Sequence, residues 1–307
     1  MLGRRTATTD GMSVKKDTRS ELLLHRAAIT GDVTRCQTVL DAGLVHVDCA
    51  DMDGTTPLLL AAANGHLACV KELLRRGADP DRRRQTGATP VFFAAQAGHV
   101  EVLRALLRQG GRPDTPTTDG ATALLVASQG GHTVCVRELL QAGAAVSARM
   151  KDRSTALFLA AQNGHHEVAA LLTDAGADPD QARVDGATPV WIAAQLGHSR
   201  VVEHLLRAGA AVDSPRHDGA TALFKAAHKG HEEVVRALLP HSPCLSVLPN
   251  GESALHAAAM FGHTTCAELL VSAGSRIELR NAEGLTPAEL ALQAGYERLA
   301  TALERRR

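Results

Sequence analysis

The sequence predicts an all-α repeat solenoid, and three observations carry this prediction. First, a threonine followed by proline or alanine recurs every 33 residues, and second, a Gly-His pair recurs in the same register. Third, 45% of the 307 residues are apolar but only 2% are aromatic, so the core must consist mostly of small side chains packed between helices. The six threonines at the 33-residue spacing are Thr56, Thr89, Thr122, Thr155, Thr188 and Thr221.

Each repeat follows the same order of elements. An Asp-Gly or Asn-Gly dipeptide, such as Asp185-Gly186, predicts a tight turn. A short helix follows, and the glycine of the Gly-His pair favours its left-handed end. A second helix then runs to an Ala-Gly-Ala ending such as Ala208-Gly209-Ala210. The expected unit is therefore turn, helix, loop, helix.

Nine such units fill residues 20–304, because Ser253 and Thr286 continue the series and a degenerate copy begins near Glu21. We expect residues 1–19 to be a flexible arm and residues 305–307 to be a basic C-terminal end. The predicted units lie near 20–50, 51–83, 84–116, 117–149, 150–182, 183–215, 216–247, 248–280 and 281–304.

The segment DGATPVWIAA at residues 185–194, followed by Gly197-His198, resembles the ankyrin repeat. The resemblance covers more than nine tenths of the chain. It implies about nine helix-loop-helix units with β-hairpin turns, and a concave face made of the turns and the first helices. It also implies a protein that binds other proteins.

Composition and charge exclude several classes of function. Lys plus Arg and Asp plus Glu both number 33, so a long-range attraction to nucleic acid is not expected. No stretch of about 18 apolar residues predicts membrane insertion, and no signal segment is recognised. We expect an intracellular monomer, in the cytoplasm rather than the nucleus.

Catalytic and metal signatures are not found in the sequence. His166-Glu167 and His231-Glu232 resemble the start of a metalloprotease motif but lack its second histidine. The Gly-His histidines stand one repeat apart, about 10 Å in a helix stack, too far to share a metal. Cys69, Cys135 and Cys266 occupy a position that is valine in other units, so they are interpreted as core residues. We predict no enzyme activity, no cofactor and no metal; an enzyme would need groove histidines such as His228 and His231.

A column of aromatic residues departs from the repeat pattern. The fourth residue of the Thr-Pro-Leu-His core is aromatic at Phe92, Phe158, Trp191 and Phe224, but histidine at His256. One interpretation is that the rings replace a histidine that hydrogen-bonds between repeats, exchanging a polar contact for apolar burial. The alternative is a partly exposed aromatic seam for a partner.

A row of glutamines follows the paired alanines of successive first helices. It comprises Gln96, Gln129, Gln162 and Gln195 and continues at His228. Solvated helix ends are one interpretation. The other is partner binding, because each amide offers both donors and an acceptor to the backbone of an extended segment.

Basic residues gather at the predicted turns, where Arg84, Lys151, Arg183 and Arg216 stand in or beside one repeat position. They are either solvated or form a ridge for an acidic or phosphorylated protein segment, since guanidinium groups match carboxylate and phosphate.

The seventh junction, at Pro240 and Pro243, lacks the usual glycine and is one residue short. We expect a bend or weakened coupling there. The apolar residues 245–248 that follow either pack on the eighth repeat or anchor a partner.

The sequence therefore predicts a non-enzymatic scaffold that binds a protein on the concave face. The alternative is a substrate-recruiting adaptor of a larger enzyme assembly such as a ubiquitin ligase. The sequence does not identify the partner.

Overall fold

The computed structural model describes residues 18–249 and 251–306, and these residues form helices, turns and loops. The helices come in pairs, one pair for each predicted repeat. They are α1 (Thr18–Thr30), α2 (Val33–Asp41), α3 (Pro57–Ala63), α4 (Leu67–Arg75), α5 (Pro90–Gln96), α6 (Val100–Arg108), α7 (Ala123–Gln129), α8 (Thr133–Gln141), α9 (Ala156–Gln162), α10 (His166–Asp174), α11 (Pro189–Leu196), α12 (Ser199–Arg207), α13 (Ala222–Lys229), α14 (Glu232–Leu238), the 3-10 helix η1 (Leu239–His241), α15 (Ala254–Met260), α16 (Thr264–Ser272), α17 (Pro287–Gln293) and α18 (Glu297–Glu304).

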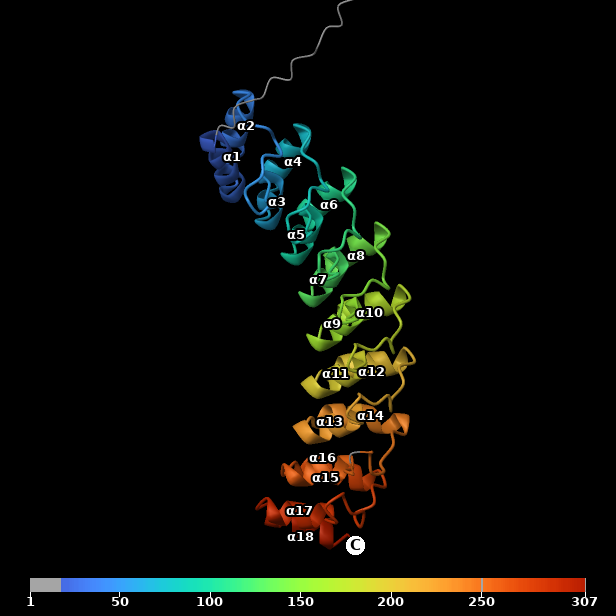
Figure 1. Cartoon of the computed structure of the whole chain (residues 1–307). Helices are drawn as coiled ribbons and strands as arrows, with labels where there is room; N and C mark the ends of the chain where they lie inside the picture. The colour runs from blue at the N-terminus through green and yellow to red at the C-terminus, as the bar shows by residue number, and fades with distance from the viewer. Residues whose placement is uncertain (1–17, 250, 307) are drawn as a thin grey trace, which may run out of the picture. The chain divides into compact units, whose positions relative to one another are not determined.

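The helices belong to two compact units. The first unit consists of the described part of residues 1–94 together with 101–111, and the second of 95–100 together with the described part of 112–307. In the first unit, α3 packs against α1 and α4. In the second, the first helices α7, α9, α11, α13, α15 and α17 stack in chain order, and the second helices α8, α10, α12, α14 and α16 stack beside them (Figure 1). The predicted helical repeat array is thus confirmed.

The recurring threonine begins the first helix of a repeat. The Thr188 hydroxyl accepts a hydrogen bond from the Trp191 N–H at 3.3 Å, which satisfies one of the N–H groups that a helix start leaves free. Thr56, Thr155 and Thr221 do the same in their repeats. Thr122 differs, because its buried hydroxyl has no hydrogen-bond partner among the described residues. The 33-residue spacing is therefore the spacing of helix caps.

The Gly-His pair joins each repeat to the one before it. The ring of His198 donates its Nε2–H to the backbone carbonyl of Gln162 at 3.0 Å, and the same ring covers Gly164. A Cβ atom on Gly164 would stand 2.7 Å from that ring, and its φ of +74° also favours glycine. His66, His132, His165, His231 and His263 make the equivalent bond at 2.9 to 3.2 Å. The structural interpretation of these histidines is confirmed.

Small side chains fill the space between first helices. The paired alanines are fully buried, as at Ala160, Ala161, Ala193 and Ala194. Among the cysteines, Cys69, Cys135 and Cys266 are also fully buried, which confirms them as core residues. Burial raises the pKa of the Cys266 thiol to about 11, so it stays protonated and unreactive at neutral pH.

The ends and turns of the array refine the predicted boundaries. Helix α1 begins at Thr18, so residues 18–19 are helical although they were assigned to the flexible arm; residues 1–17 lie outside the described residues. Of the predicted β-hairpin turns, the one at residues 149–155 contains an isolated β-bridge, between Arg149 and Thr155. Successive turns of the second unit are connected by single backbone bonds, such as His217 N–H to the Asp185 carbonyl at 3.0 Å.

The seventh junction differs from the other repeat ends. The 3-10 helix η1 follows α14 directly, and Ser242 takes the left-handed conformation, with φ of 54°, that glycine adopts elsewhere. The Cys244 N–H nevertheless donates to the Asp213 carboxylate at 2.9 Å. The same bond joins Ala211 to Asp180 in the repeat before, so this contact between repeats is kept at the seventh junction, and the weakened coupling stays a prediction.

Candidate partner-binding surface

We call the turns and first helices of the second unit together the turn face. The glutamine row (Gln96, Gln129, Gln162 and Gln195) lies on it, at the C-terminal ends of α5, α7, α9 and α11. The backbone carbonyls of all four accept the histidine bonds described above, so their backbones are held in place. Gln96 and Gln129 are exposed, and Gln162 and Gln195 are half-buried. In the described part of the chain their side-chain amides have no hydrogen-bond partner.

His228 continues the row on α13 but has a different environment. Its ring centroid lies 4.4 Å from that of the partly exposed Phe261. Burial lowers the pKa of His228, and the nearby positive charges of Lys225 and Lys229 lower it further. The ring is therefore neutral at pH 7. Its Nδ1 atom is buried and, within the described residues, has no hydrogen-bond partner.

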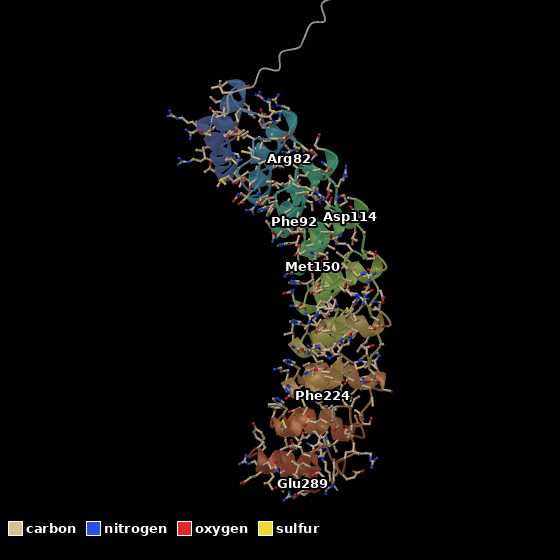
Figure 2. All side chains as sticks on the ribbon, viewed as in Figure 1. Arg82, Phe92, Asp114, Met150, Phe224 and Glu289 are labelled. Atoms are coloured by element: carbon tan, nitrogen blue, oxygen red, sulfur yellow. The ribbon has the colours of Figure 1, made fainter. Side chains whose placement is uncertain are left out.

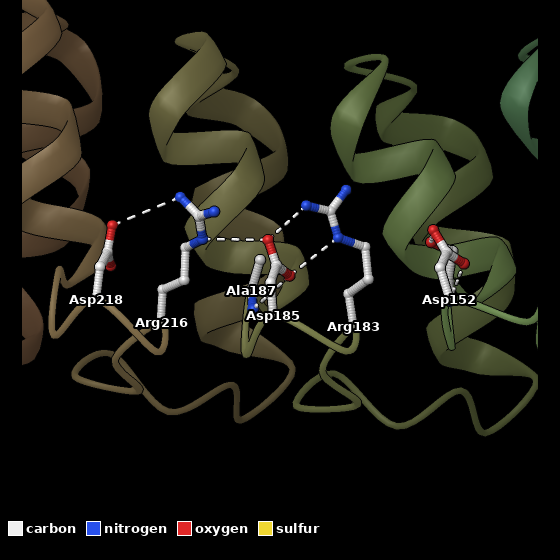
Figure 3. A network of polar contacts seen from close by, with 7 residues as sticks. Asp152, Arg183, Asp185, Ala187, Arg216 and Asp218 are labelled. Atoms are coloured by element: carbon white, nitrogen blue, oxygen red, sulfur yellow. Dashed lines mark hydrogen bonds and ion pairs between the residues drawn. The ribbon is translucent and has the colours of Figure 1, made fainter.

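Two of the predicted basic residues form an ion-pair network with the aspartates of the turns (Figure 3). Arg183 donates two hydrogen bonds to the Asp185 carboxylate, at 2.9 and 2.5 Å. Arg216, one repeat later, reaches the same carboxylate at 3.1 Å and lies 3.5 Å from Asp218. The hydrogen bonds from Arg183 hold the pKa of the Asp185 carboxyl well below its usual range, so this carboxylate stays ionised between two guanidinium groups.

The same arginines also cover aromatic rings of the preceding repeat. The guanidinium of Arg183 lies 5.4 Å from the centroid of the Phe158 ring, and that of Arg216 lies 5.2 Å from the Trp191 ring. Both arginine side chains are only about one third exposed, at 32% and 34%. These contacts fix the arginines in the stack.

The two other predicted cations differ from each other. In the first unit, Arg84 donates to Asp53 at 3.0 Å. In the second, Lys151 is exposed at its turn, with no ion pair in the described part of the chain. Within the described residues, three of the four basic residues thus form an ion pair, and Lys151 does not.

The aromatic column is buried, so the exposed seam is a wrong interpretation. Phe92, Phe158, Trp191 and Phe224 are all at most 8% exposed. The predicted loss of the polar contact is also wrong for Trp191, whose indole Nε1–H donates to the Ala220 carbonyl at 2.8 Å. His256 makes the equivalent bond to the Leu285 carbonyl at 3.2 Å. Trp191 therefore keeps the bond between repeats that a histidine makes at this position.

The last residue of the apolar segment 245–248 packs within the array. Leu248 is buried in a cluster with Ala220, Phe224 and Ala257, so it fills the space between the seventh and eighth repeats. Phe224 of this cluster is labelled in Figure 2. Leu245 and Val247 are half-buried. The packing interpretation therefore holds for Leu248.

Comparison with known families agrees with the repeat geometry. A profile described as "Ankyrin repeats (3 copies)" matches residues 24–117, 91–183 and 176–246, and one described as "Ankyrin repeats (many copies)" matches residues 223–271. The chain belongs to the ankyrin repeat family. Ankyrin repeats are protein-interaction modules, and no enzyme family was matched.

Several curated ankyrin proteins are similar to parts of this chain. Ankyrin repeat domain-containing protein 29 of Danio rerio is 46% identical over 74 residues, 24% of this chain and 25% of that protein. Its Homo sapiens counterpart is 46% identical over 68 residues, 22% and 23% of the two chains. Ankyrin repeat and SOCS box protein 18 of Homo sapiens is 74% identical over 27 residues, 9% and 6% of the two chains. The first two matches thus span about a quarter of those relatives.

Two lysines of the seventh ankyrin repeat were not predicted from the sequence as candidate site residues. Lys225 stands where the repeats before it have apolar residues such as Leu159 and Ile192, and Lys229 stands where they have Asn163 and Leu196. Both lie on α13 of the turn face, where Lys229 is exposed and Lys225 is half-buried. Comparing each ankyrin position down the repeats would have singled them out, because only the first repeat, with Arg26 at the Lys225 position, places another cation at either position.

Metal binding and membrane insertion find no support in the described residues. Residues 18–249 and 251–306 contain no group of three histidine, cysteine or acidic side chains that could hold a metal ion. None of the helices described is long and apolar enough to cross a membrane. His204 on α12 shares a hydrogen bond of 2.8 Å with Thr173 and lies edge-on to His166, which is a packing arrangement between second helices.

Proposed function

We propose that this ankyrin protein is a non-enzymatic scaffold or adaptor that binds a segment of a partner protein on the turn face of its second unit. The observation that carries the proposal is the glutamine row. The backbones of its four residues are held by histidines of the following repeats, while their side-chain amides have no partner within the described protein. Four amides on fixed backbones are thus presented at a regular interval.

The interval suits the backbone of an extended peptide. Stacked helices stand about 8 to 10 Å apart, and an extended chain advances about 3.3 Å per residue. Successive amides of the row therefore meet every third residue of such a chain. Each amide donates to a backbone carbonyl or accepts from a backbone N–H. This mode demands little of the partner's side chains, so the row contributes affinity rather than specificity.

The basic residues of the turns favour an acidic or phosphorylated partner segment. Lys151 is exposed and is the most accessible of them. Arg84, Arg183 and Arg216 contribute only if a ligand shares or displaces the aspartates that they already bind. We therefore assign Lys151 the larger direct role and the arginines a smaller one.

A triple variant tests the proposal. Gln129→Ala, Gln162→Ala and Gln195→Ala together remove three amides of the row and leave the backbone bonds intact. Partners are first captured from a cell lysate with the intact chain, and their binding to the variant is then measured with purified proteins. We expect at least a tenfold loss of affinity with unchanged helical circular dichroism.

The matched control is Gln109→Ala with Gln141→Ala, which removes two exposed amides that follow or end second helices. It should bind as the intact chain does. Unchanged binding by the triple variant would show that the glutamine row is not part of the interface.

A second proposal is that the chain recruits substrates to a larger enzyme assembly such as a ubiquitin ligase. Its support is the 27-residue match to a protein named for ankyrin repeats and a SOCS box, a match shorter than one 33-residue repeat. Ubiquitin-ligase subunits that copurify with the intact chain in stoichiometric amounts would favour it. A partner protein captured without such subunits would favour the simple scaffold.

A further inference from the structure

The second unit carries a pair of cations that nothing in the described protein neutralises. Lys225 and Lys229, which we call the lysine pair, stand one helical turn apart on α13, where like charges repel each other. The Lys225 ammonium lies 5.8 Å from the Trp191 ring centroid and 5.7 Å from that of Phe224. These rings hold it at the surface by cation–π attraction but leave its full charge available. No carboxylate within the described residues forms an ion pair with either lysine.

Exposed apolar residues flank the lysine pair on both sides. Leu196 at the end of α11 is 43% exposed, and Phe261 just after α15 is 42% exposed. Leu196, Lys229 and Phe261 occupy the same position of three consecutive repeats, and α13 packs against both α11 and α15. They therefore form a line in which the cation lies about 10 Å from an apolar side chain on either side.

The ring of His228 adds a polar group within this line. It lies between the lysines in sequence, contacts the Phe261 ring at a tilted angle, and has a buried Nδ1 atom without a hydrogen-bond partner in the described chain. A buried polar atom left without a partner is costly, so this helix surface is not built for the greatest stability of the stack.

We propose that Leu196, Lys225, Lys229 and Phe261 bind an extended protein segment that carries a carboxylate with an apolar side chain three residues before it and another three residues after it. The spacing follows from about 10 Å per repeat and about 3.3 Å per residue of extended chain. This inference rests on the proposed scaffold function and specifies the chemistry of its partner.

The apolar flanks favour a peptide over a nucleic acid or another polyanion. A polyphosphate chain would gain from the two ammonium groups but not from burying Leu196 and Phe261, whereas an acidic peptide with apolar neighbours gains from both. A carboxylate also meets less competition here than at the turns, where Asp185 already occupies the guanidinium groups.

A synthetic probe tests the recognition directly. The probe is a fluorescein-labelled nonapeptide with leucine, glutamate and leucine at its second, fifth and eighth positions and serine and threonine elsewhere. We expect saturable binding by fluorescence anisotropy, and at least a tenfold loss in the variant Lys225→Gln with Lys229→Gln. Leu196→Ala and Phe261→Ala should each weaken binding severalfold, and a probe with the same composition in scrambled order should bind more weakly.

A charge-matched control removes two exposed cations from second helices, Lys71→Gln and Arg200→Gln. It should bind the probe as the intact chain does, and both double variants should show the same thermal melt as the intact chain. Equal binding by the lysine and control variants, or a lack of saturable binding to the intact chain, would overturn the proposed ligand chemistry.

Selection from a random peptide library on the intact chain separates this inference from the general scaffold function. Enriched peptides with the acidic and apolar spacing that no longer bind the lysine variant support both. Enriched peptides of other chemistry, or ones indifferent to the lysines, overturn the inference and leave the scaffold function standing. A selection without enrichment counts against both, and lysine-dependent retention on heparin alone would identify a polyanion site instead.

Discussion

The turns around Asp185, which we call the turn edge, and the surface of α13 each carry two basic residues. The two regions differ in which groups of the protein oppose these positive charges. At the turn edge, Arg183 and Arg216 share the Asp185 carboxylate and lie over buried rings. On α13, Lys225 and Lys229 have no carboxylate partner in the described structure. The number of basic residues on a surface therefore does not show whether it can bind an acidic ligand. What matters is whether hydrogen bonds within the protein already occupy those residues.

The largest effect is expected at the ring beneath Arg216. Trp191 is 2% exposed, and Trp191→Ala removes its buried volume, its cation–π contacts and its bond to the Ala220 carbonyl. We expect a loss of about 3 to 5 kcal/mol in the free energy of unfolding, measured by urea denaturation. Trp191→Phe keeps most of the apolar volume and should cost about 1 to 2 kcal/mol. A loss below about 1 kcal/mol for the alanine variant would contradict a structural role for the turn edge.

Two glycine variants compare a position in a contact that joins repeats with a position on an open surface. Gly164 and Gly176 both have positive φ, at +74° and +88°, but only Gly164 lies under a histidine ring. Gly176→Ala should cost about 1 to 2 kcal/mol from backbone strain alone. Gly164→Ala should cost about 1 to 3 kcal/mol more, because its Cβ displaces His198. Equal urea midpoints for the two variants would show that the packing of the His198 ring on Gly164 contributes nothing to stability.

The carboxylate of the turn edge should make a smaller, pH-dependent contribution. Asp185→Asn leaves Arg183 and Arg216 without their shared partner, and we expect a loss of about 1 kcal/mol at pH 7. Because the folded protein lowers the pKa of Asp185, the stabilisation is present above the unfolded pKa of about 4 and is lost as the pH falls below it. Urea denaturation at pH 7 and pH 3 should therefore show a smaller difference between variant and parent at the lower pH. A difference that grows on acidification would contradict this assignment.

The smallest effect on stability is expected for the lysine pair. Lys225→Gln with Lys229→Gln removes a repulsion between like charges and the cation–π contacts of one ammonium, which nearly offset each other. The free energy of unfolding should change by less than about 0.5 kcal/mol. A clear destabilisation would place these lysines among the contacts that hold the stack.

The sequence predicted the fold because its regular features are local. Thr188 caps the helix that it begins, and Gly197 takes the left-handed conformation that ends it, so the spacing of such residues reveals the repeat. Whether a side chain is available to bind a ligand depends on partners within the protein that lie a whole repeat away. Arg216 reaches Asp185 across 31 residues, and Trp191 reaches the Ala220 carbonyl across 29, which the pattern of one repeat does not contain. The sequence therefore marked the arginines as a candidate site and did not single out Lys225 and Lys229.

The most direct test compares two double variants in two assays. Arg183→Gln with Arg216→Gln and Lys225→Gln with Lys229→Gln each remove two positive charges from the turn face. Urea denaturation and anisotropy with the acidic nonapeptide are measured for both. We expect the arginine variant to lose stability and, under native conditions, to retain peptide binding within about twofold, and the lysine variant to keep its stability and lose binding at least tenfold. The reverse outcome, with binding lost only in the arginine variant, would contradict the distinction between paired and available charge.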